Sequence, residues 1–168
     1  MGSGPMPHSI IREIIERFSA PPLPPISEQE IVELENRLGF ALPPLLRELY
    51  QYVGNGRFGP GCGFLSLNDL GDHEFSVVGL YTEFTETNSE DSIGTWPNQL
   101  LPFCYWGCTK FSCMDCASLA NPVFSHEREA GQPVDMTLVL TRSSFEIWLR
   151  DWMAGKDVFE SAYEHDPE

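Results

Sequence analysis

Four of the five cysteines lie close together in the sequence, and clustered thiolates are typical ligands of structural zinc. Cys104, Cys108, Cys113 and Cys116 follow a C-x3-C-x4-C-x2-C spacing. Structural zinc sites usually join two ligand pairs that are separated by about a dozen residues or more. Residues 110–117 are a predicted strand, in which Cys113 and Cys116 would point to opposite faces. We therefore predict no metal and no cofactor, with the thiols packed as small apolar groups, and keep a zinc site on these four cysteines as the alternative.

The sequence contains few arrangements that are typical of catalysis. It has no G-x-S-x-G nucleophile motif, and His126-Glu127 lacks the second histidine of a zinc protease. We expect His73 and His126 to be surface or hydrogen-bonded residues. A Cys–His pair formed in space stays open, because the sequence favours no particular pair. We therefore predict that the protein is not an enzyme.

Five glycines between Gly54 and Gly63 resemble a phosphate-binding loop only in composition. No lysine followed by Ser or Thr closes the loop, and no G-x-G-x-x-G opens a helix after a strand. We expect a tight, irregular turn whose backbone needs positive φ angles.

Acidic residues exceed basic ones by 25 to 10, which gives a formal net charge of −15. This excess argues against binding to nucleic acid or to an anionic membrane, and it favours a basic protein partner. The polar stretch at residues 85–95 and its neighbours are either a solvated loop or the surface that contacts this partner. The candidate partner-binding residues are these carboxylates and two tryptophans that could be exposed enough to act as anchors: Asp69, Asp72, Glu74, Glu83, Glu86, Glu90, Asp91, Trp96 and Trp106.

Residues 26–67 predict the helices that position these groups. Ser27 and Glu30 have the spacing of a capping box, and Gly39 is suited to end the helix that Ser27 begins. Pro44 is suited to the first turn of a second helix, which we expect to end at Gly54. Before this stretch, Ser9 is placed to cap a short apolar helix.

The remainder predicts one further helix, several short strands and a closing helix. Helical spacing of apolar residues marks 75–84, and the expected strands are 64–67, 100–105, 110–117, 123–127 and 136–141. Ser143 or Ser144 would cap the last helix, where Ser143 with Glu146 fits a capping box and Gly155 is its expected end. Consecutive short strands favour antiparallel pairing. The predicted fold class is α+β, with N-terminal helices, a mostly antiparallel sheet of four to six strands and a closing C-terminal helix.

Two stretches resemble a known family. LGFALPPLLRELYQYVGNGRFGPGCGFLSL at residues 38–67 resembles the start of the SUKH superfamily, the homologues of a yeast cell-wall-synthesis regulator of the Smi/Knr type. LLPFCYWGCTKFSCMDC at residues 100–116 is similar to the second signature of that family. The resemblance runs from Ile26 to about Trp152. It implies an α+β binding protein and, for bacterial members, an immunity protein that binds and neutralises a cognate toxin. Many toxins bound by such immunity proteins act on nucleic acids and carry basic surfaces, so the resemblance together with the charge leads us to expect a basic toxin that acts on nucleic acid. The alternatives are a regulatory scaffold or adaptor, and a small zinc-binding protein.

We expect one domain with two short extensions. Residues 1–25 would form an N-terminal helix and a Pro-rich spacer packed on the domain, residues 26–155 the SUKH-like α+β domain, and residues 156–168 an acidic C-terminal tail. Within this tail we single out Val158, Phe159 and Tyr163 as residues that could pack. The sequence lacks both a long apolar run and a signal-peptide pattern, so we expect a cytoplasmic protein with reduced thiols and no membrane contact.

Overall fold

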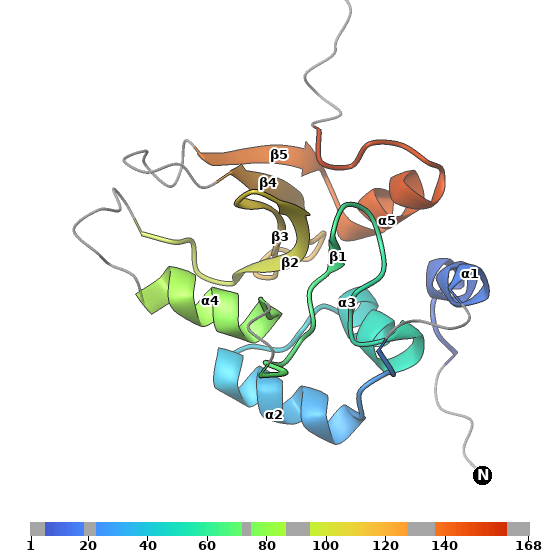
Figure 1. Cartoon of the computed structure of the whole chain (residues 1–168), viewed down its shortest axis with the longest axis horizontal. Coiled ribbons are helices and arrows are strands. Elements are labelled where there is room, and N and C mark those ends of the chain that lie inside the picture. Colours follow the sequence, from blue (N-terminus) through green and yellow to red (C-terminus); the bar gives the residue numbers. More distant parts are fainter. Residues whose placement is uncertain (1–5, 19–22, 72–74, 87–94, 128–136, 161–168) are drawn as a thin grey trace, which may run out of the picture.

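A computed structural model of the chain describes residues 6–18, 23–71, 75–86, 95–127 and 137–160. Its architecture is α+β, as the sequence predicted (Figure 1). The helical elements are α1 (Ser9–Arg17), α2 (Glu28–Leu38), α3 (Pro44–Glu48), the π-helical turn η1 (Leu49–Val53), α4 (Val77–Glu86) and α5 (Phe145–Met153). The strands are β1 (Gly63–Phe64), β2 (Leu100–Gly107), β3 (Lys110–Asp115), β4 (Val123–Glu127) and β5 (Leu138–Arg142).

The strands form one antiparallel sheet in the order β1-β2-β3-β4-β5. Neighbours in sequence are neighbours in space, so each strand pairs with the one before it. The predicted strands lie within two residues of β2 to β5 at both ends. Strand β1 is shorter than predicted, because the chain leaves β2 after Leu65, whose amide donates to the carbonyl of Phe103.

The two faces of the sheet are covered by different elements, because neighbouring residues of a strand point to opposite faces. On β3, the Phe111 ring contacts Phe84 of α4 at 5.9 Å between ring centroids. The next residue, Ser112, accepts a hydrogen bond from the indole of Trp106, which packs on Phe159. Helix α4 therefore covers one face, and the C-terminal segment covers the other.

The N-cap at Ser27, the glycine end of α2 and the proline start of α3 are confirmed. The Ser27 hydroxyl accepts from the amide of Glu30, and Gly39 ends α2 with a φ of 90°. Pro44 is the first residue of α3. The prediction that Ser9 caps α1 is wrong: Ser9 is already helical, and His8 is the N-cap. Glu48 explains the shift, because its carboxylate accepts from the backbone amide of His8 and pairs with its ring.

Of the two neighbouring serines before α5, Ser144 is the N-cap. Ser144 has an extended backbone, and its hydroxyl accepts from the amide of Ile147 at 3.1 Å. The capping box that paired Ser143 with Glu146 is therefore wrong by one residue. Helix α5 ends at Met153, and Gly155 follows with a φ of 83°, close to the predicted end.

The glycine-rich stretch before β1 is a tight turn with positive φ, as predicted. At Gly56 the φ angle is 91°, and an added Cβ would lie 2.7 Å from the backbone of Leu65. At Gly61 the φ angle is 63°, and an added Cβ would meet the Trp106 ring at 2.7 Å. The turn thus folds back onto β1 and β2, where side chains at these positions would clash.

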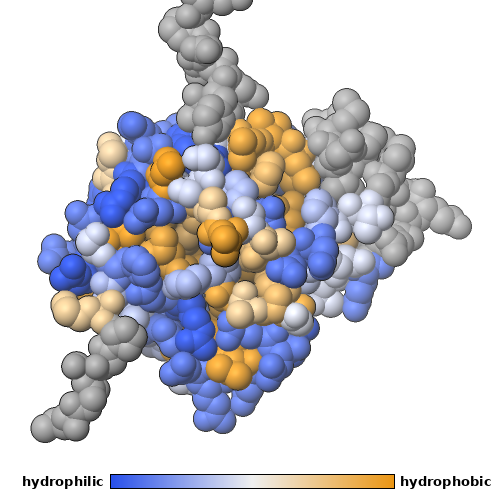
Figure 2. Space-filling model, turned by 180° about the vertical axis from the view of Figure 1, so that it is seen from behind, coloured by the Kyte–Doolittle hydropathy of each residue, from blue (hydrophilic) through white to orange (hydrophobic). Residues whose placement is uncertain are grey.

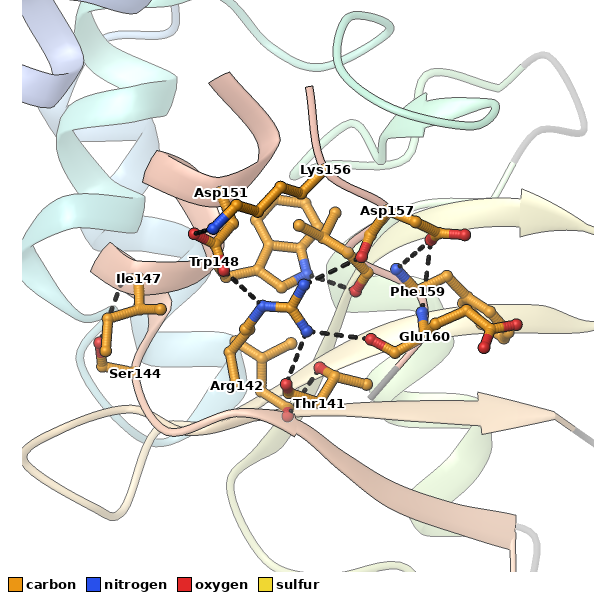
Figure 3. A network of polar contacts seen from close by, with 12 residues as sticks. Thr141, Arg142, Ser144, Ile147, Trp148, Asp151, Lys156, Asp157, Phe159 and Glu160 are labelled. Atoms are coloured by element: carbon orange, nitrogen blue, oxygen red, sulfur yellow. Dashed lines mark hydrogen bonds and ion pairs between the residues drawn. The ribbon is translucent and has the colours of Figure 1, made fainter. Parts of the chain in front are cut away.

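Arg142 joins the C-terminal segment to the sheet (Figure 3). Its side chain is 5% exposed and pairs through Nε with Asp151 of α5 at 2.8 Å. The other guanidinium nitrogens donate to the carbonyl oxygens of Thr141, Asp157 and Glu160 at 2.7–2.9 Å. This arrangement satisfies a buried cation mostly with backbone carbonyls.

The same segment is also held by packing. Val158 is fully buried, and its carbonyl accepts from the Trp148 indole at 3.1 Å. Phe159 packs on Trp106 at 5.4 Å and lies beneath Lys110. Of the three residues singled out in the tail, Val158 and Phe159 pack on the domain, and Tyr163 lies outside the described residues.

Candidate partner-binding surface

Three of the seven predicted carboxylates lie within the described part of the chain, and all three are exposed. Glu83 and Glu86 are three residues apart on α4, so they lie on one side of this helix. Asp69 lies between β1 and α4, where its carboxylate accepts from the amide of Gly71 at 2.8 Å. Outside the described residues lie Asp72, Glu74, Glu90 and Asp91.

Helix α2 adds carboxylates that the sequence analysis did not single out. Its core residues are Ile31 and Leu34, whereas Glu28, Glu30 and Glu33 are exposed. Helices α2 and α4 pack against each other (Figure 1). The helical spacing of the core residues could have identified these positions, because the three glutamates fall off the Ile31–Leu34 face. The exposed carboxylates therefore extend over two neighbouring helices.

Arg47 partly neutralises the negative charge of α2. Arg47 of α3 pairs with Glu28 at 3.2 Å and with the half-buried Glu35 at 3.4 Å. Glu35 also accepts from the amide of Leu42 at 2.6 Å, so this carboxylate holds the α2–α3 connection. Glu35 is therefore structural, whereas Glu30 and Glu33 project from the helix.

Apolar side chains also reach the surface of the molecule. Figure 2 shows apolar residues that reach the surface among hydrophilic ones on the face seen from behind. Large exposed apolar side chains include Val139 and Leu140 of β5 and Ile147 of α5.

The expectation that Trp96 is exposed is wrong. Its side chain is buried, with a residue exposure of 7%. The indole donates to the carbonyl of Leu100 at 2.7 Å, and the ring packs on Phe84 at 4.7 Å and on His126 at 5.0 Å. Trp96 therefore closes the core between α4 and the sheet, and a satisfied indole nitrogen makes such burial favourable.

Trp106 is half-buried rather than fully exposed. Its indole donates to Ser112 Oγ at 2.8 Å, and Phe159 covers part of the ring. Only the remaining edge of Trp106 is available to a partner.

The four cysteines of the suggested zinc spacing lie in different surroundings. Cys104 and Cys113 are buried in the sheet, Cys108 is exposed in the β2–β3 turn, and Cys116 is half-buried after β3. Within residues 6–18, 23–71, 75–86, 95–127 and 137–160, no three His, Cys, Asp or Glu side chains are grouped as metal ligands. The zinc alternative thus has no preformed ligand set in this part of the chain.

Burial makes the inner thiols poor nucleophiles. It raises the pKa of Cys113, and it also raises the pKa of Cys104, where the nearby thiols of Cys62 and Cys113 act in the same direction. The pKa of Cys116 rises to about 12 through burial and the nearby Asp115 carboxylate. Thiols with raised pKa values hold little thiolate near neutral pH, which disfavours both nucleophilic attack and metal binding.

His126 is a buried, hydrogen-bonded residue, in line with the second of its two predicted settings. It is 4% exposed, and its Nδ1 lies 3.0 Å from Thr137 Oγ1. The ring packs edge-on against Phe84 and Trp96. These contacts place His126 in the aromatic core beneath α4.

Among the described segments, the helices are too short and too polar to cross a bilayer.

Comparison with known proteins gives one positive result. Residues 25–151 match the profile of the SMI1 / KNR4 family (SUKH-1). This range coincides with the resemblance to the SUKH superfamily noted between Ile26 and Trp152, and it confirms that resemblance. No curated protein matches the chain.

Proposed function

Because this chain belongs to the SMI1/KNR4 family (SUKH-1), we propose that it is an immunity protein that binds a cognate bacterial toxin and blocks it. The observation that supports this role most directly is the negative charge of the protein. The chain has 25 acidic residues against 10 basic ones, and exposed carboxylates lie on the adjoining helices α2 and α4. In this proposal the protein acts in the cytoplasm, with reduced thiols and without a cofactor.

The negative charge of this chain favours a basic toxin as the partner, in particular one that acts on nucleic acid. Such a toxin needs a cationic surface for its phosphate-rich substrate, and an acidic protein competes for that surface. Opposite charges also raise the rate of association, which matters for an inhibitor that must act before damage occurs.

Occlusion requires no bond-making step. The two exposed thiols, Cys62 and Cys108, lie in the glycine-rich turn before β1 and in the β2–β3 turn. In our proposal the rigid α+β domain presents carboxylates to the toxin and covers its active surface. The candidate contacts are Asp69, Glu83 and Glu86, with Glu30 and Glu33 of α2 beside them and part of Trp106.

The test is neutralisation of the toxin encoded beside the gene for this chain. Co-expression should restore growth of cells that produce the toxin, and the two purified proteins should form a one-to-one complex in size-exclusion chromatography. A complex without neutralisation, or capture of several unrelated proteins without the toxin, would contradict immunity and favour a regulatory scaffold.

A further inference from the structure

A cavity of about 350 Å³ opens between the glycine-rich turn, β1 and Phe75, which lies two residues before α4. Its volume lies at the lower end of the range for small-ligand sites, roughly 300–1,000 Å³. The lining residues are Arg57, Cys62, Gly63, Phe64, Leu65, Ser66, Phe75 and Tyr105. None of them belongs to the carboxylates considered above, so this is a separate feature of the surface.

A short parallel bridge between Ser66 and Ser76 builds one side of the cavity. The amide of Val77 donates to the carbonyl of Ser66 at 2.8 Å, and that of Val78 donates to Leu67 at 3.2 Å. The bridge therefore holds Phe75, the residue before Ser76, close to Ser66, which lies nine positions earlier in the sequence.

Aromatic rings form the wall next to this bridge. Phe75 meets Tyr105 edge-on, with 5.3 Å between centroids, and Phe111 at 5.7 Å. Yet Phe75 is 46% exposed. A large, exposed apolar side chain that lines a hollow favours an apolar or aromatic occupant, because filling the hollow would remove its surface from water.

Arg57 limits the charge of that occupant. It has a φ of 63°, and its amide donates to the carbonyl of Phe64 at 2.8 Å. Among the described residues that line the cavity, it carries the one cationic side chain. A guanidinium at the wall stacks favourably on the face of an aromatic ring and disfavours an entering lysine or arginine.

We propose that this cavity receives one aromatic side chain of the basic partner protein, an inference that rests on the proposed function. In this proposal the rest of the interface is electrostatic. Lysines and arginines of the partner lie outside the cavity and face exposed carboxylates such as Asp69. A buried aromatic anchor surrounded by charged contacts is a common arrangement in tight protein interfaces.

The cavity can be tested without the partner, by NMR titration of the full chain with N-acetyl-L-tryptophanamide. We expect saturable shifts at the amides of Gly63, Ser66 and Phe75, and no such shifts with N-acetyl-L-argininamide. The shifts should disappear in Phe75→Ala, return in Phe75→Tyr, and persist in Ile147→Ala, which removes an equally exposed apolar side chain from α5. Equal shifts with both amides, or shifts that survive Phe75→Ala, would overturn the proposal.

A second measurement separates this proposal from the proposed function. With the neutralised toxin in hand, Phe75→Ala should weaken its binding about tenfold or more, and Ile147→Ala should leave it unchanged. Unchanged binding by Phe75→Ala would overturn the docking site and leave immunity standing. A wild-type chain that binds no toxin would overturn immunity and the partner assignment, and the titration would still decide whether the cavity takes an aromatic group.

Discussion

At the scale of single residues, burial separates four of the five cysteines into two chemical groups, with the half-buried Cys116 between them. Cys62 and Cys108 lie in turns and meet solvent, whereas Cys104 and Cys113 lie on central strands with no exposure. The Sγ atom of Cys104 points to the carbonyl of Pro60 at 3.6 Å, which is a weak hydrogen bond inside the core. Two of the four thiols in the suggested zinc spacing, those of Cys104 and Cys113, are thus packed within one strand pair, as small apolar groups are.

Thiol alkylation should follow this division. In the native protein at about pH 8, iodoacetamide should modify Cys62 and Cys108 first, Cys116 slowly, and Cys104 and Cys113 only after unfolding, because burial raises their pKa values and blocks access. Peptide mass spectrometry against time measures the order. Early modification of Cys104 in folded protein would contradict the burial described here.

The buried groups also predict a loss of stability in alkali. Tyr50 is fully buried and donates to the carbonyl of Leu65 at 2.7 Å, and burial raises its pKa above the ordinary value of 10.0. The pKa values of Cys104 and Cys113 are raised in the same way above 9.0. Above these ordinary values the unfolded chain releases protons that the folded chain retains, so the free energy of unfolding falls as pH rises.

For each such group, the free energy of unfolding should fall by about 1.4 kcal/mol per pH unit. The fall should begin near pH 9 for the two thiols and near pH 10 for Tyr50. Urea unfolding between about pH 8 and 11 measures it. Tyr50→Phe should lower stability at neutral pH by about 1 kcal/mol, because Leu65 loses a donor, and should flatten the slope above about pH 10. Tyr52→Phe, at an exposed position of η1, serves as the control; equal slopes in both variants would contradict the role of Tyr50.

At the scale of elements, the N-cap of helix α5 is one of two adjacent serines, Ser144. Ser144→Ala removes the acceptor for the Ile147 amide and should cost about 1 kcal/mol of unfolding free energy. Ser143→Ala changes an exposed neighbour and should cost less than about 0.5 kcal/mol. Thermal or urea unfolding of the pair tests the assignment, which a larger loss in Ser143→Ala would reverse.

The contact between β5, α5 and the C-terminal segment depends on Arg142. Arg142→Ala leaves Asp151 and three carbonyl oxygens without this donor, so we expect a loss of about 3 kcal/mol or more in unfolding free energy. Arg12→Ala, at an exposed position of α1, should be nearly neutral. Proteolysis near residue 157 should accelerate in Arg142→Ala alone. Equal stability of both variants would show that the network contributes little.

At the scale of the whole molecule, a net charge of −15 should control the rate of partner binding more than its strength. Glu83→Lys together with Glu86→Lys should slow association with the toxin about tenfold, and raised salt should slow the wild type in the same direction. Glu13→Lys together with Glu146→Lys makes the same charge change on α1 and α5 and should have a smaller effect. Stopped-flow or surface-binding kinetics measures the association rates. Equal slowing by both pairs of substitutions would mean that the toxin does not contact α4 in particular, or that the rate depends only on the overall charge of the protein.

The sequence alone determined the order and approximate bounds of the elements, because their signals are local. The capping serine at Ser27, the left-handed glycine at Gly39 and the proline at Pro44 act on their own few residues of backbone. Apolar periodicity located α4 and the strands for the same reason. The family resemblance and the charge excess were likewise readable without coordinates.

The tertiary structure decided which side chains meet solvent and which distant residues meet one another. Trp96 is buried because α4 and the sheet close over it, and the choice of Ser144 over Ser143 depends on where β5 ends. Arg142 binds carbonyls 15 and 18 residues away, and Ser66 places Phe75 at a cavity wall. These features arise from packing between segments far apart in the chain, whose free energy no local pattern of residues encodes.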